Sequence, residues 1–140
     1  MKQQILGAVL ACLPALAMAA PAIEVVDGWA RAMPPVAKNS AGYVVIRNTG
    51  DADDALLGAV VEGARVTELH EMVHADGAMA MRRRAEIAVP AGGEVRLKPG
   101  GLHLMLIDLQ QPLKPGGQRR ATLRFREAGE VEVTLEVRGQ

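Results

Sequence analysis

Cysteine is nearly absent from this 140-residue chain, which contains only Cys12. That residue lies in a leader that begins with Met1-Lys2, continues as an apolar run and ends in small residues. This is the pattern of a secretory signal peptide. We therefore expect residues 1–20 to be removed, with cleavage after Ala19 or Ala20.

The exported domain, residues 21–140, would then have neither a disulfide nor a thiolate ligand. This disfavours a blue-copper electron-transfer site, which needs a cysteine. Lipidation of Cys12 is disfavoured because this cysteine comes before the apolar run is complete. The leader is too short to be kept as an ordinary membrane span, so we expect no span in the mature form.

Aromatic side chains are also scarce, and the formal net charge is zero. Only Trp29, Tyr43 and Phe125 are aromatic, so the stacking platform of a single-strand binder is missing. The basic run Arg82-Arg83-Arg84 is too short for a nucleic-acid stripe and is typical of a solvated strand face. Nucleic acid is therefore not an expected partner.

Short strand patterns follow one another along the domain. The clearest lies between Val131 and Val137, where apolar and polar residues alternate. Weaker strand patterns occur at 23–26, 43–47, 56–61, 94–97, 102–109 and 122–126. Turn clusters rich in Gly, Pro, Asn or Asp lie between them, at 48–51, 90–93, 99–101 and 115–117. This spacing predicts an all-β sandwich or barrel.

Residues 70–74, His-Glu-Met-Val-His, fit H-E-x-x-H, a zinc signature in which two histidines bind the metal and the glutamate acts as general base. That signature needs a helix, but Asp76-Gly77 follows at once and is a strong hairpin signal. No later segment has the helical period expected of a third-ligand helix. A zinc hydrolase is therefore the least favoured alternative.

A two-residue turn at Asp76-Gly77 would fix the register of the strands around it. His74 would then lie opposite Met79. Glu71 would point to the opposite face as a surface carboxylate. Met72 would lie opposite Met81, and His70 would lie diagonal to Met81. The hairpin face with the histidines would therefore carry His70, Met72, His74, Met79 and Met81.

Soft metal donors are concentrated between residues 70 and 105. All three histidines and four of the five methionines beyond residue 20 fall there. His103 and Met105 are two apart on an expected strand and so point to one side. Imidazole and thioether donors without thiolate or carboxylate favour Cu(I). Methionine is also common core filler, so packing without metal is an equal alternative on these grounds alone.

These residues and their spacing resemble the periplasmic copper chaperones of the PCu(A)C type. The pattern of that family is a histidine, ten residues, a methionine, twenty-one residues and histidine-x-methionine. Here His70, Met81, His103 and Met105 have all of these spacings. Further similarity lies at residues 27–31, 41–43, 68–72 and 98–106, so it extends over almost the whole exported domain.

The resemblance implies a cupredoxin-like Greek-key β-sandwich in the periplasm, with an exposed Cu(I) site formed by His70, Met81, His103 and Met105. It implies no enzymatic activity. It implies delivery of copper to a partner, either the CuA centre of a cytochrome c oxidase subunit or another copper carrier. Met72 and Met79 are possible additional ligands, with packing as their simpler role, and His74 would be a turn residue.

A copper buffer or tolerance protein is the main alternative function, because it would need the same site. Some family members bind a second copper at a tail rich in histidine and methionine. Residues 136–140, Glu-Val-Arg-Gly-Gln, have no such donors, so Cu(II) binding at a tail is not expected here.

Overall fold

The computed structural model describes residues 7–14 and 18–139, and in these ranges it contains strands and no helix. No helix that could cross a membrane is therefore present among the described residues. The strands are β1 (Ile23–Arg31), β2 (Asn39–Asn48), β3 (Asp54–Val61), β4 (Ala64–Ala75), β5 (Ala78–Arg84), β6 (Ile87–Val89), β7 (Glu94–Arg96), β8 (Leu102–Leu109), β9 (Gln118–Phe125) and β10 (Gly129–Arg138). The expected all-β class is confirmed.

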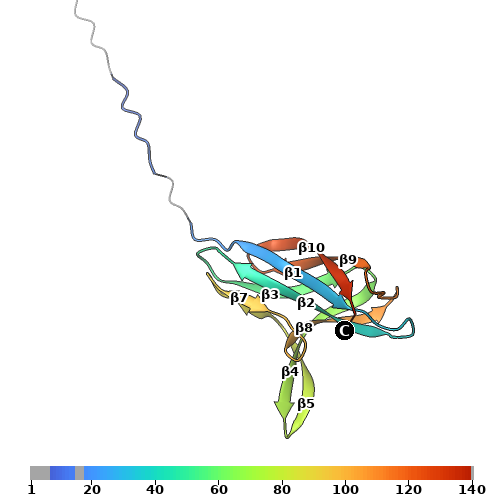
Figure 1. Cartoon of the computed structure of the whole chain (residues 1–140). Helices are drawn as coiled ribbons and strands as arrows, with labels where there is room; N and C mark the ends of the chain where they lie inside the picture. The colour runs from blue at the N-terminus through green and yellow to red at the C-terminus, as the bar shows by residue number, and fades with distance from the viewer. Residues whose placement is uncertain (1–6, 15–17, 140) are drawn as a thin grey trace, which may run out of the picture.

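The strands form a sandwich from which one hairpin extends. Hydrogen-bonded neighbours follow the order β5-β4-β8-β2-β1-β10-β9-β3-β6, with β7 also paired to β2. All pairs are antiparallel except β1 with β10, which is parallel. Figure 1 shows the β4–β5 hairpin projecting away from the body of the sandwich.

The core is made by the alternating apolar residues of facing strands. Leu104 and Leu106 of β8 and Leu135 of β10 are all completely buried. Gly28 of β1 makes room for this packing, because a Cβ atom there would lie 2.9 Å from Cδ2 of Leu135. The predicted alternation of the last strand is confirmed, since Leu135 and Val137 are buried while Glu136 between them is exposed.

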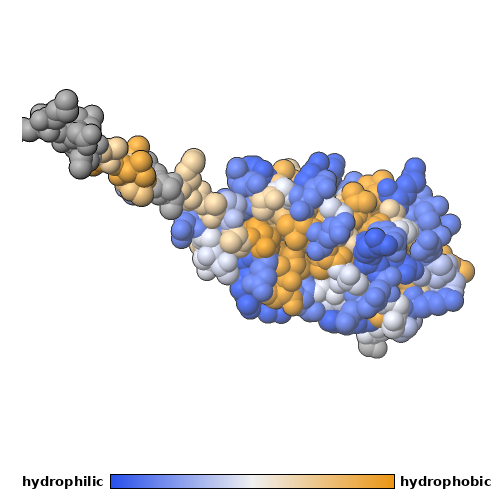
Figure 2. Space-filling model, turned by 90° about the horizontal axis from the view of Figure 1, so that it is seen from above, coloured by the Kyte–Doolittle hydropathy of each residue, from blue (hydrophilic) through white to orange (hydrophobic). Residues whose placement is uncertain are grey.

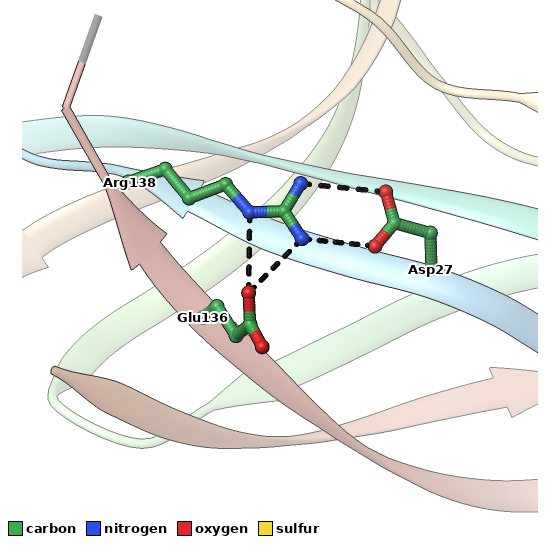
Figure 3. Close-up of polar contacts among 3 residues, drawn as sticks. All are labelled: Asp27, Glu136 and Arg138. Carbon is green, nitrogen blue, oxygen red and sulfur yellow. Dashed lines mark hydrogen bonds and ion pairs between the residues drawn. The ribbon is translucent and has the colours of Figure 1, made fainter. Parts of the chain in front are cut away.

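The parallel pair β1–β10 carries a surface ion network (Figure 3). Arg138 Nη2 lies 3.1 Å from Oδ1 of Asp27 and 3.1 Å from Oε2 of Glu136. Its guanidinium carbon is also 5.8 Å from the centre of the Trp29 ring. These charges are about half exposed, so each pair contributes little to stability.

On the face seen from above, apolar side chains gather between hydrophilic ones (Figure 2).

Several boundaries differ from the sequence expectation. Strand β1 continues to Arg31, well beyond the predicted end at residue 26. Strand β6, Ile87–Val89, was not predicted, because three residues before a proline are too few to show a period. The described leader residues 7–14 and 18–20 form no strand. The chain joins the body where the carbonyl of Ala20 accepts a hydrogen bond from the Asp51 amide at 3.0 Å.

Candidate metal site

The hairpin of β4 and β5 forms with the predicted register. Asp76 and Gly77 both have positive φ, at 50° and 77°, as a two-residue type I′ turn requires. Met72 pairs with Met81, and His74 pairs with Met79. The H-E-x-x-H residues thus lie on a strand and not on the helix of a zinc enzyme.

Strand β8 lies on the other side of β4 and supplies the remaining donors. Its register places His103 opposite His70 and Met105 opposite Glu68. Directly paired residues point to the same face of a sheet, and the two imidazole ring centres are 5.9 Å apart. Met81 lies diagonal to His70 on β5. Three strands therefore bring all four predicted donors to one face.

A cavity of about 350 Å³ opens on this face. Met72, Met81, His103 and Met105 are among the residues that line it. The other lining residues are Arg31, Asn39, Ser40, Ala41, Tyr43 and Gly100. His70 lies outside this lining. His103 is only 4% exposed, whereas Met81 is 48% exposed, so the donors range from a buried imidazole to an accessible thioether.

The hydrogen bond of His103 fixes which ring nitrogen is free. Its Nδ1 lies 3.1 Å from the carbonyl oxygen of Gly101. A carbonyl only accepts, so Nδ1 must carry the proton and the lone pair is on Nε2. Burial lowers the pKa of His103 below its usual value, although the bond to Gly101 acts in the opposite direction. The ring is therefore neutral at pH 7, which is the form that binds metals.

In His70 the nitrogen without a hydrogen bond is Nδ1. Its Nε2 lies 2.7 Å from Oε2 of Glu68. The pKa of Glu68 is lowered, mainly by this hydrogen bond and further by the nearby Arg83, so the carboxylate is ionised and accepts the Nε2 proton. Nδ1 of His70 is buried and has no hydrogen-bond partner among the described residues. A buried polar atom without a partner is costly, and a bound metal ion would satisfy it.

The donor set fits a soft ion better than a hard one. Two imidazole nitrogens and two thioether sulfurs are ligands typical of Cu(I). Among residues 7–14 and 18–139, no group of three His, Cys, Asp or Glu side chains is placed to hold a metal. Glu71, the glutamate of the zinc signature, is paired with Arg82 at 3.0 Å and Arg84 at 2.8 Å on the other face of the strand. It is therefore not positioned as a general base for this site.

Sequence reasoning missed several residues around the donors. Glu68 was not predicted, although its position two residues before His70 places it on the same strand face. Tyr43 and Arg31, joined by a hydrogen bond of 3.0 Å, also line the cavity. They lie in segments that resemble the family, but the sequence did not place them at the site, because β2 and β1 reach it only through tertiary pairing. Of the two additional candidates, Met72 lines the cavity and Met79 does not.

The overall fold is similar to those of solved copper-bound proteins. A copper-bound PCuAC domain from PmoF2 matches with a TM-score of 0.69 at 27% identity, over 84% of this chain and 93% of that one. The solution structure of CuI-DR1885 from Deinococcus radiodurans matches with a TM-score of 0.65 at 28% identity, over 89% and 81%. The predicted sandwich fold is thereby confirmed, and the structural neighbours include PCuAC domains, as the sequence resemblance implied.

Sequence comparison gives the family. A protein of Leifsonia xyli subsp. xyli named "Putative lipoprotein Lxx21020" is 32% identical over 117 residues, which are 83% of this chain and 69% of that protein. The family model described as "Putative lipoprotein LpqE-like" matches residues 23–137. This description differs from the PCu(A)C name that the sequence resemblance implied, but the two are consistent, because the structural matches include PCuAC domains. The chain belongs to the LpqE-like family.

Proposed function

We propose that this protein is a Cu(I)-binding metallochaperone that carries the ion on His70, Met81, His103 and Met105. The observation that carries the proposal is the convergence, on one sheet face, of two imidazoles whose hydrogen bonds leave opposite nitrogens free. The thioethers of Met81 and Met105 lie on the same face. Structural similarity to the copper-bound PCuAC domain and to CuI-DR1885 supports copper as the cargo.

The exposures of the donors suit transfer by ligand exchange. Met81 is about half exposed on the projecting hairpin, whereas His103 is almost fully buried in the sandwich. An incoming ligand of a partner can therefore replace the thioether of Met81 first, while the histidine still holds the ion. Copper moves without a change of oxidation state and without covalent chemistry, so the protein needs no catalytic residue.

The recipient is the finer part of the proposal. We infer delivery to the CuA centre of a cytochrome c oxidase subunit or to another copper carrier. The alternative is a copper buffer that sequesters the ion. The two are separated by mixing the loaded protein with a purified CuA-domain subunit, because a buffer would retain its copper while a chaperone would transfer it.

Export to the periplasm and removal of residues 1–20 belong to the same proposal. The described leader residues, 7–14 and 18–20, are exposed and form no strand. The family and its relative bear the name lipoprotein, which agrees with an exported protein.

Metal binding is tested by an anaerobic Cu(I) titration against a chromophoric chelator, run beside a Zn(II) titration. The whole chain is used with Cys12→Ser, because Cys12 is exposed and would itself bind Cu(I). One tight Cu(I) equivalent that is lost in His103→Ala, with weak zinc, is the expected result. Tight zinc with weak Cu(I), or no tight metal at all, would overturn the proposal.

A further inference from the structure

A second pair of soft donors lies at the tip of the β4–β5 hairpin. His74 and Met79 are directly paired next to the turn, and both are exposed. Met79 exposes 48% of its surface, on a hairpin that projects from the sandwich body (Figure 1). Neither residue lines the cavity of the site described above. A methionine in this position is not core filler, so packing within this chain does not explain it.

The tip pair lies on the same face as the inner donors. Moving two residues along each strand from His74 and Met79 leads to the pair Met72–Met81, which lines the cavity. Each such step covers about 7 Å along a strand. Soft side chains therefore follow one another from the solvent-exposed tip to the buried imidazole of His103.

Direct pairing also gives the tip a suitable geometry. Side chains of paired residues start from Cβ atoms about 5 Å apart and point to the same face. An imidazole nitrogen of His74 and the sulfur of Met79 can therefore reach one ion between them. The thioether of Met72, one step further in, is on the same strand face as His74 and can serve as a third donor.

We propose that His74 and Met79, with Met72, form an outer site for a soft monovalent ion such as Cu(I). This inference rests on the proposed function, because the outer site is useful only if the inner donors hold copper. The outer site has fewer donors and greater exposure, so it binds the ion more weakly than the inner site. Copper enters or leaves through it by exchange of one neutral ligand for another, with no change of oxidation state.

The test follows the methionine methyl groups and histidine rings by NMR during an anaerobic Cu(I) titration of the Cys12→Ser chain. The first equivalent should shift the methyl signals of Met81 and Met105. Copper beyond one equivalent should shift the methyl signal of Met79 and the ring signals of His74. In Met79→Leu this second response should be lost and the first unchanged, whereas Met33→Leu, which is outside the donor cluster, should change neither.

The two hypotheses fail in different ways. If the signals of Met79 and His74 stay unchanged at several-fold excess of copper while the inner methyl groups respond, the outer site is wrong and the proposed function stands. If only the tip signals respond, the inner site is wrong and the tip is a metal site without it. In His103→Ala the tip response should persist, and its loss would show that the tip is not a separate site.

Discussion

His70 and His103 are directly opposite each other on β4 and β8, yet different ring nitrogens of the two side chains are engaged in hydrogen bonds. The carboxylate of Glu68 accepts a hydrogen bond from Nε2 of His70, while the carbonyl oxygen of Gly101 accepts one from Nδ1 of His103. Free lone pairs are therefore on Nδ1 of one ring and Nε2 of the other. Such outer hydrogen bonds orient metal-binding histidines and fix their tautomers.

Replacing Glu68 should weaken copper binding without removing a ligand. In Glu68→Gln the carboxylate that fixes the His70 tautomer is lost, and changes of this type typically reduce metal affinity by about 10–100-fold. The affinity is measured by chelator competition, and the tautomer of His70 by ¹⁵N NMR of the metal-free protein.

Glu71→Gln is the matched control for this change. Glu71 is also a glutamate on β4 with a lowered pKa, caused by hydrogen bonds from Arg84 and Arg82, but it lies on the opposite face. Copper affinity should be unchanged in this variant. Equal losses in the two variants would mean that Glu68 acts through the fold and not through the His70 ring.

Replacing the thioethers should separate binding from folding. In Met81→Leu and Met105→Leu the side-chain volume is nearly conserved, so each should cost less than about 1.5 kcal/mol of unfolding free energy. Cu(I) transfer to the recipient should be abolished in the double variant. Thermal unfolding checks the first expectation and copper transfer the second, with Met33→Leu as control. Undiminished transfer would contradict the assigned ligands.

Burial of His103 should make the stability of the metal-free protein depend on pH. Its folded-state pKa lies below the usual value of 6.5, chiefly because burial disfavours the charged ring. Below about pH 6.5 the unfolded chain therefore binds a proton that the folded chain does not. The unfolding free energy should fall as the pH decreases from 6.5 toward the folded-state pKa and stop falling below it.

Urea unfolding at several pH values, with a chelator present, measures this dependence. His103→Gln removes the titrating ring, so its contribution to the slope between pH 6.5 and the lower folded-state pKa should disappear. A slope of the same size in the variant would assign the effect to other groups.

The mass of the exported protein should show whether the leader has been removed and after which residue it was cleaved. Cleavage after Ala19 leaves Ala20, whose carbonyl accepts the Asp51 amide at 3.0 Å; cleavage after Ala20 removes that acceptor. Mass spectrometry of the protein recovered from a bacterial cell envelope distinguishes these products. A chain that begins at a lipid-modified Cys12 would contradict processing at Ala19 or Ala20.

Much of the hairpin and its donors could be predicted from local sequence. Asp76-Gly77 fixed a two-residue turn, and the strand period of two then placed Met72 opposite Met81 and His74 opposite Met79. Strand β8 was predicted with its observed bounds, Leu102–Leu109, because its apolar run begins directly after the turn cluster at 99–101 and ends before two glutamines and a proline. Longer strands such as β1 were predicted only in part, because the mixed segment around Gly28 has no clear alternation.

The sequence by itself determined which donors exist, that they are soft, and how those within one hairpin face each other. Only the tertiary structure brought His103 opposite His70, buried the ring of His103 and left Met81 exposed. It also selected Glu68 and the Gly101 carbonyl as partners of the two rings. The reason is physical: turn chemistry and strand period act between neighbours in the chain, whereas the β4–β8 register joins residues more than thirty positions apart and depends on how the whole sandwich packs.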